Sequence, residues 1–175
     1  KRQASNLEKV AEDIRNEFAC AVTTLACDLN VVAELEPMVR DALSQHPVDI
    51  LMNNAGIHIP SRFLDYQFPD FRSVIETNLY SVFHLCQMVI PTMLNHGGGR
   101  VINIASTAGK WGSRNQAAYN ASKHAVLGLT RCLALEMGPQ NVLVNAICPW
   151  IVDTDMADDI VEKHAVMGKM SGNDL

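Results

Sequence analysis

The chain has 175 residues, of which 48% are hydrophobic and 19% are charged, a composition that excludes a disordered protein. This length suits one domain with a core of its own, and we expect a single domain over residues 1–175. The net charge of −5 and the lack of a long apolar run exclude nucleic acid and membrane as expected partners.

The cysteines form no C-x-x-C pair, so their spacing supports neither a zinc site nor a disulfide framework. The histidines show no ligand spacing either, and we expect no metal site. The cysteines are Cys20, Cys27, Cys86, Cys132 and Cys148. Because each has apolar neighbours, we expect buried, reduced thiols in a cytoplasmic protein.

The first elements alternate between helical and extended patterns. Apolar residues at helical spacing predict a helix over residues 7–18. The apolar run over 21–26 predicts a strand, after which Asp28 lies in a loop. A second helix is predicted over 32–43, where Pro37 must lie in the first turn or distort the helix.

The same alternation continues to the end of the chain. Further elements are predicted as strands over 48–52, 100–105 and 142–147, helices over 71–94 and 119–137, and a weakly helical tail over 155–170. The strands are continuous apolar runs, which predicts an α/β fold with a parallel sheet that helices cover on both faces. In such sheets ligands bind beyond the carboxyl ends of the strands. Polar or turn residues follow the predicted strands there, at Asp28, Asn53, Asn54, Ser106 and Pro149.

Tyr119 and Lys123 lie one helical turn apart, so their side chains project from one face of the predicted helix. Reduction of a carbonyl group needs a proton for its oxygen, and tyrosine, with a pKa of about 10, is a poor acid–base at neutral pH. A neighbouring ammonium favours the phenolate, so we expect Lys123 to lower the pKa of Tyr119. Ser106 would hold the substrate oxygen.

Each of these features also has a structural explanation. A Tyr–Lys pair occurs by chance on many helices. Asn78, inside an apolar helix, could be a core amide whose hydrogen bonds are satisfied. The segment 53–56 could be only a tight turn.

Five motifs in this order resemble the short-chain dehydrogenase/reductase (SDR) family. They are N-N-A-G at 53–56, E-T-N at 76–78, I-A-S-T-A-G at 104–109, Y-N-A-S-K at 119–123 and V-N-A-I-C-P at 144–149. The resemblance implies a Rossmann-like, doubly wound sheet and an oxidoreductase that moves hydride between a nicotinamide cofactor and a carbonyl group. The motifs are most similar to those of 3-oxoacyl and polyketide ketoreductases, and 3-hydroxybutyrate and secondary-alcohol dehydrogenases carry similar segments.

By this resemblance Asn78, Ser106, Tyr119 and Lys123 form a catalytic tetrad. Lys123 would also bind the nicotinamide ribose, and Asn78 would hold a water for proton relay. The cofactor contacts that the resemblance implies are Asp28, Leu29, Asn54, Ala55, Gly56, Tyr119, Lys123, Pro149, Val152 and Thr154. Among them, Asp28 would contact adenine, and Val152 and Thr154 would contact the nicotinamide end.

The chain departs from the family pattern in three respects. It has no G-x-x-x-G-x-G phosphate loop and lacks the first two strands that accompany it. It carries Trp150 where the family has glycine, and it ends before the family's last strand. We therefore expect a partial domain from a longer enzyme, with unpaired sheet edges, weakened cofactor binding and a nicotinamide site crowded by Trp150.

The cofactor is expected to be NADP, with NAD as the alternative. Lys1 and Arg2 could hold the 2′-phosphate of NADP, although they could equally be solvated charges at a helix start. The expected substrate is a small carbonyl compound or alcohol, in a pocket that involves His58, Trp111, Asn115 and the tail after Thr154.

The same resemblance implies that the helices that begin near Phe71 and Tyr119 form the contacts of a homodimer or homotetramer. Two other functions remain open at this point. One is a non-catalytic SDR-fold binding protein or an inactive fragment. The other is a nucleotide-sugar epimerase or dehydratase, which shares Tyr-x-x-x-Lys; N-N-A-G and the short chain favour the SDR reading over it.

Overall fold

The computed structural model describes residues 4–154, so the predicted tail over 155–170 and the basic pair Lys1 and Arg2 lie outside the described residues. The helices and strands are α1 (Ala4–Phe18), α2 (Val32–Gln45), β1 (Ile50–Asn53), α3 (Phe68–Ile75), α4 (Ser81–Asn95), β2 (Gly99–Ile104), α5 (Ala117–Met137) and β3 (Val142–Ile147). Short 3-10 turns η1 (Phe63–Asp65), η3 (Thr107–Gly109) and η4 (Gly138–Gln140) and a π turn η2 (Glu76–Tyr80) lie between them.

The three strands form one parallel sheet in the order β1-β2-β3. Leu51 lies opposite Val101, which in turn lies opposite Val144, and these three residues therefore share one face. Parallel neighbours require crossover connections, which α3 to α4 and α5 provide. The α/β class and the parallel, Rossmann-like arrangement are thus confirmed.

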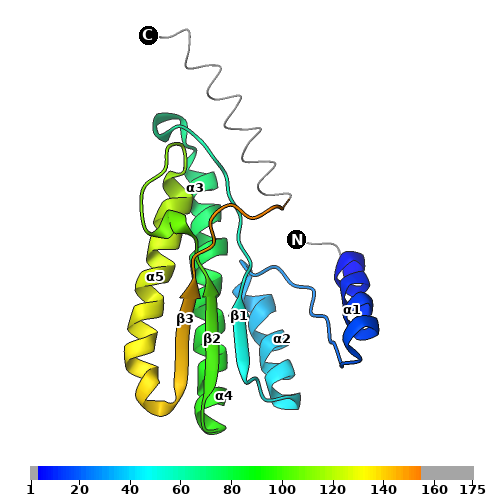
Figure 1. Cartoon of the computed structure of the whole chain (residues 1–175). Helices are drawn as coiled ribbons and strands as arrows, with labels where there is room; N and C mark the ends of the chain where they lie inside the picture. The colour runs from blue at the N-terminus through cyan, green and yellow to red at the C-terminus, as the bar shows by residue number, and fades with distance from the viewer. Residues whose placement is uncertain (1–3, 155–175) are drawn as a thin grey trace.

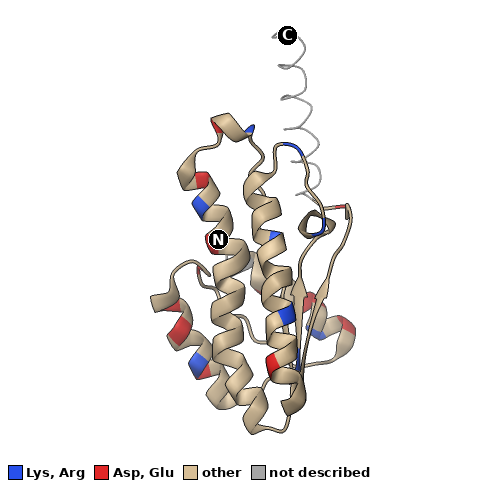
Figure 2. Ribbon diagram, turned by 90° about the vertical axis from the view of Figure 1, so that its left-hand side faces the viewer, with Lys and Arg blue, Asp and Glu red and all other residues tan. Residues whose placement is uncertain are grey.

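The core lies between this sheet and the helices α4 and α5 (Figures 1 and 2). Val101 and Val144 of the sheet pack in one apolar cluster with Met93 of α4 and Val126 of α5, and all four are buried. Dense burial on this face fixes the helices relative to the carboxyl ends of the strands.

The prediction that helices cover both faces of the sheet is wrong for the described residues, because no described helix covers the opposite face. Its apolar side chains Ile50, Met52, Leu143 and Ile147 are all exposed. In the described part of the chain the only helix not packed on the core side is α1, which lies beside the sheet rather than over it (Figure 1). The sequence pattern predicts strands that are apolar on both faces, but it does not determine whether a layer of helices packs on each face.

The strand predicted over 21–26 is wrong. This segment runs between α1 and α2, away from β1, and forms no ladder (Figure 1). Leu25 within it is 44% exposed. A strand exists only where a neighbouring backbone accepts and donates its hydrogen bonds, and no described strand lies beside this run.

The helix predicted over 71–94 is longer and less regular than its pattern indicates. It runs without a break from Phe68 to Asn95, and the π turn η2 interrupts its α-helical bonding around Asn78. Such turns are rare, and they occur frequently at functional sites. In α2, Pro37 lies beyond the first turn, inside the helix, so the first of its two predicted placements is wrong.

The cysteines are unpaired, but they are not all buried as predicted. Cys86 is buried, whereas Cys20 and Cys132 are exposed. Cys20 follows α1 and Cys132 lies on the outer side of α5, where helical rotation rather than sequence neighbours decides exposure. Among the described helices, none is both long and apolar enough to cross a membrane.

Candidate active site

The predicted tyrosine and lysine lie in the first two turns of α5. The Lys123 Nζ atom is 5.6 Å from the centre of the Tyr119 ring. Lys123 is only 4% exposed, and its Nζ donates a 2.7 Å hydrogen bond to the carbonyl oxygen of Ile104, the last residue of β2. This bond ties the start of α5 to the carboxyl end of the central strand.

Ser106 follows that strand end, with only Ala105 between them. Its backbone is extended, and its Oγ accepts a 3.1 Å hydrogen bond from the Ala108 N–H at the start of η3. The turn packs closely on α5, because a Cβ atom at Gly109 would lie 2.7 Å from the carbonyl oxygen of Lys123. The Ser106 side chain also lies near enough to the Tyr119 phenol to lower its pKa, so the structure brings the predicted serine and tyrosine together.

Asn78 reaches the same place from the π turn. Its side chain is 1% exposed; Oδ1 accepts from the Ile57 N–H at 2.8 Å, and Nδ2 donates to the Ile57 carbonyl at 2.9 Å. A Cβ atom at Gly56 would lie 3.4 Å from Asn78 Oδ1 and 3.7 Å from Lys123 Nζ. Asn78 is therefore a satisfied buried amide that also lies beside the lysine.

Ser122 is a residue whose role the sequence did not reveal. It is completely buried; its Oγ accepts from Asn78 Nδ2 at 3.1 Å and donates to the Tyr119 carbonyl at 2.8 Å. It thus couples the π turn to α5. The available signal was a serine in the interior of a predicted helix, where its hydroxyl needs a specific partner.

The electrostatics differ from the prediction. Burial lowers the pKa of Lys123 to about 8, against a smaller opposing effect of Cys148. Burial raises the pKa of Tyr119, and the nearby Ser106 side chain offsets only part of that rise. The prediction of a lowered pKa for Tyr119 is therefore wrong for this structure, because removing the phenol from water outweighs the effects that lower its pKa.

Residues predicted to contact the adenine end also lie at the carboxyl side of the sheet. Asp28 Oδ1 accepts from the Asn30 N–H at 3.1 Å, and the Asn30 side chain donates to Thr77 Oγ1 of η2 at 3.1 Å. Leu29, between them, is half-buried. The loop that carries Asp28 therefore lies beside the turn that carries Asn78.

The segment after β1 fits close approach of a ligand. Asn54 and Ala55 are exposed, and Gly56 has no side chain that would separate its backbone from Lys123. The role of these residues in holding a cofactor stays a prediction, and the sequence offers no glycine-rich loop for the pyrophosphate.

Pro149, Val152 and Thr154 follow β3 at the carboxyl end of the sheet. The carbonyl of Pro149 accepts a 3.0 Å bond from the Thr107 N–H, which places Pro149 beside the Ser106 turn. Val152 is exposed, and Thr154 Oγ1 donates to its carbonyl at 3.3 Å. The roles of Val152 and Thr154 at the nicotinamide end stay predictions.

Two of the residues predicted for a substrate pocket lie near the tyrosine. The His58 ring packs edge-on against the Tyr119 ring, with centres 4.8 Å apart. The Asn115 carbonyl accepts a 2.9 Å bond from the Ser61 N–H, which joins the segment after β1 to the loop before α5. The two loops therefore meet at the face that Tyr119 occupies.

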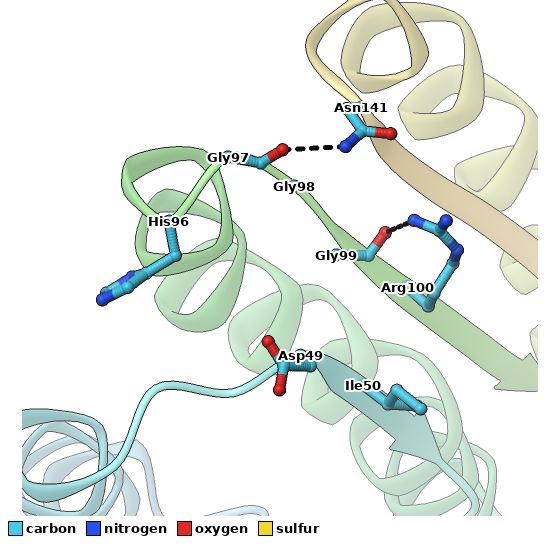
Figure 3. Close-up of a pocket in the computed structure, with 8 residues that line it drawn as sticks. All are labelled: Asp49, Ile50, His96, Gly97, Gly98, Gly99, Arg100 and Asn141. Carbon is cyan, nitrogen blue, oxygen red and sulfur yellow. Dashed lines mark hydrogen bonds between the residues drawn. The ribbon is translucent and has the colours of Figure 1, made fainter.

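A shallow pocket lies at the other end of the sheet, where the strands begin (Figure 3). It is lined by Asp49, Ile50, His96, Gly97, Gly98, Gly99, Arg100 and Asn141. The Asn141 Nδ2 donates to the Gly97 carbonyl at 2.8 Å across its rim. None of the predicted site residues lines it, so we assign the candidate active site to the carboxyl ends of the strands.

Comparison with known proteins agrees with this arrangement. The family model for short chain dehydrogenase matches residues 1–165. D-beta-hydroxybutyrate dehydrogenase of Cupriavidus necator is 40% identical over 79% of this chain and 54% of its own length. The 3-oxoacyl-acyl-carrier-protein reductase FabG of Staphylococcus epidermidis is 36% identical over 86% of this chain and 62% of its own length.

Solved structures show the same fold. A single-residue variant of actinorhodin polyketide ketoreductase, crystallised with NADPH, superposes with a TM-score of 0.89 at 36% identity. The match covers 95% of this chain and 64% of that one. The chain thus spans between 54% and 64% of the length of these three proteins. Motifs, geometry and family match lead to one conclusion: the chain belongs to the short chain dehydrogenase family.

Proposed function

We propose that the chain forms the catalytic part of an NAD(P)-dependent oxidoreductase that interconverts a carbonyl group and a secondary alcohol. The observation that carries the proposal is the convergence of Asn78, Ser106, Tyr119 and Lys123 at one end of the sheet. Four side chains from three separate segments meet there, and a purely structural role would not require this combination of groups.

In the reducing direction, Ser106 would donate a hydrogen bond to the carbonyl oxygen, and Tyr119 would give that oxygen its phenolic proton. The phenol stays protonated at neutral pH and so carries the proton to be given, whereas its raised pKa makes it a weaker acid that a charged neighbour must assist. Lys123, with a pKa of about 8, would stabilise the phenolate left behind. Asn78 and Ser122 would hold the π turn and α5 in register around the tyrosine.

A bound nicotinamide supplies or accepts the hydride. NADP is the favoured cofactor and NAD the alternative, a preference supported by the NADPH in the structure of the related ketoreductase. The ribose and nicotinamide end would be held by Asn54, Ala55, Gly56 and Lys123. The cofactor would also contact Asp28, Leu29, Tyr119, Pro149, Val152 and Thr154.

The leading substrate class is a 3-oxoacyl compound, as the names of the related reductases suggest. The protein would act as a single domain in the cytoplasm, in keeping with its unpaired cysteines.

A homodimer or homotetramer would form through α3 to α4 and α5. Figure 2 shows α4 as a long helix free of charged residues, and its Phe83 is exposed. Light scattering on the chain and on F83D tests this arrangement, since F83D is expected to be monomeric.

The test of the function is NADPH oxidation by this chain with ethyl acetoacetate, a simple 3-oxo ester. Y119F is expected to lower turnover by about 10²–10⁴-fold, the usual contribution of a general acid. Y80F, which changes an exposed tyrosine at the end of η2, is the matched control and should keep its activity. Equal activity of Y119F and the original chain would refute the proposed role.

The alternative is a non-catalytic protein that retains the SDR fold. Titration with NADPH and NADH, followed by tryptophan fluorescence, separates the alternatives. Saturable binding without turnover would support a binding protein. Absence of binding by a folded chain would mean that these residues alone do not form the cofactor site.

A further inference from the structure

The only two tryptophans of the chain contact each other beside the candidate active site. The ring centres of Trp111 and Trp150 are 5.7 Å apart, and the ring planes are inclined by 52°. Trp111 is 48% exposed and Trp150 is 66% exposed. We call these two residues the tryptophan pair. Within the described residues, the pair leaves a large apolar surface open to water, which is costly unless a ligand uses it.

Trp111 is fixed relative to the proposed acid. The side chain of Asn120, the residue after Tyr119, donates a 3.0 Å hydrogen bond from Nδ2 to the Trp111 carbonyl. Asn120 lies in the first turn of α5, which the buried Lys123 ties to β2. The backbone of Trp111 is therefore held against the helix turn that presents the phenol.

Trp150 is fixed relative to the proposed substrate-holding serine. It follows Pro149, whose carbonyl accepts from the N–H of Thr107 at 3.0 Å, and Thr107 is the residue after Ser106. Trp111 is thus hydrogen-bonded to Asn120, the residue after Tyr119. Trp150 follows Pro149, which is hydrogen-bonded to Thr107, the residue after Ser106. These two backbone attachments place the tryptophan pair at the same end of the sheet as Ser106 and Tyr119.

The chemistry of this surface selects one kind of substituent. Indole faces favour rings and hydrocarbon chains, and the exposed side chains of Ile151 and Val152 extend the apolar surface beyond Trp150. We propose that the tryptophan pair binds the apolar substituent of the substrate, which is a ketone with a ring or extended hydrocarbon next to its carbonyl group. This inference rests on the proposed function, because it takes Ser106 and Tyr119 to hold the carbonyl oxygen.

The pair reports its own occupancy, since no other tryptophan contributes to the fluorescence. The experiment titrates the chain, with and without NADP⁺, with cyclohexyl methyl ketone and with butanone, neither of which absorbs where tryptophan emits. Because the larger ketone has four more carbons that the indoles can cover in part, it should bind about tenfold more tightly than butanone. Free N-acetyltryptophanamide corrects for collisional quenching.

Two variants test the pair itself. W150G removes one ring and leaves Trp111 as the reporter, and W111F removes the other indole and leaves Trp150. The preference for cyclohexyl methyl ketone should fall to about twofold or less in W150G and should shrink in W111F. L135A removes an exposed apolar side chain near the far end of α5 and should keep the full preference. Circular dichroism confirms that each variant is folded.

Several outcomes would overturn the inference. These are equal affinity for the two ketones, no saturable response to either, or a preference that survives in both tryptophan variants. Emission that changes on dilution but not with ketone would show that a second copy of the chain covers the pair instead. NADPH oxidation, measured in parallel, is a separate readout: tight ketone binding without turnover contradicts the proposed function, and turnover that favours butanone contradicts only the pair.

Discussion

The amino-terminal region, residues 4–31, and the sheet region, residues 50–147, start from similar sequence patterns and end in different environments. Both contain apolar residues at helical spacing and short apolar runs. In the sheet region the runs become strands that helices cover, whereas the amino-terminal run over 21–26 stays unpaired (Figure 1).

Burial expresses this difference most clearly. Met93 and Val101 of the sheet region are fully buried, but Phe18 and Leu25 of the amino-terminal region are exposed. The comparison teaches that periodicity shows which face of an element is apolar, while a neighbouring layer decides whether that face contributes to stability.

Polar contacts dominate in the amino-terminal region. The Arg15 guanidinium bonds to the Glu8 carboxylate at 2.7 Å and to the Val22 carbonyl at 2.7 Å, and Thr24 Oγ1 donates to the other Glu8 oxygen at 3.0 Å. Such exposed contacts set local geometry and add little to global stability. The two regions should therefore respond differently to substitution.

The largest effect is expected for a cavity in the sheet region. M93A should lower the free energy of unfolding by about 2–5 kcal/mol, because the buried methionine fills the space between α4 and the sheet. L25A in the amino-terminal region should change it by less than about 0.5 kcal/mol. Urea denaturation of both variants gives the comparison, and similar losses would show that the extended segment is packed.

The next largest effect concerns the buried lysine. The pKa of Lys123 falls from 10.5 in the unfolded chain to about 8 in the folded chain, so between these values the unfolded state binds more protons. Stability should therefore rise with pH across this window, and the rise should be absent from K123M. The free-energy gap between K123M and the original chain should change by about 2.5 kcal/mol between pH 7 and pH 10.

The unfolding free energies of K123M and the original chain must be compared, because other titrating groups lower the stability of both as the pH rises. Burial raises the pKa of Cys86 to about 11 and also raises that of Tyr119, so both lose stabilisation as the pH rises above 9. K110M, which replaces an exposed lysine, should show the pH profile of the original chain. If the free-energy gap between K123M and the original chain does not change with pH, the Lys123 ammonium of the original chain is hydrated in the folded state.

A smaller effect is expected for the link between Asn78 and α5. S122A should cost about 1–2 kcal/mol, because it removes a buried acceptor for Asn78 and a donor for the Tyr119 carbonyl. S81A removes an equally buried hydroxyl that donates to the Thr77 carbonyl at 2.6 Å, and it should cost less. Equal costs in urea denaturation would argue against a specific role of Ser122.

The smallest effect on global stability is expected for R15A. Its unfolding midpoint in urea should match that of the original chain, but chymotrypsin should cleave after Phe18 and Leu25 more quickly, since the contact that holds Val22 is lost. Cleavage within α4 serves as the internal control. A large shift of the midpoint would show that the two regions unfold as one unit.

Much of the sheet region could be predicted from sequence. The strand over 142–147 was predicted with its observed bounds, and the other two strands differ by one or two residues at their ends. The site residues Ser106, Tyr119 and Lys123 could also be chosen, because their motifs lie at strand and helix ends whose positions the local pattern fixes.

The sequence by itself determined the α/β class, the parallel strands and the side chains available for acid–base chemistry, since all of these follow from local pattern and residue type. Only the tertiary structure decided that residues 21–26 form no strand, that burial raises the pKa of Tyr119, and that Ser122 joins Asn78 to α5. It also brought Trp111 and Trp150 together. Strand pairing, desolvation and ring contact depend on neighbours distant along the chain, which no local pattern contains.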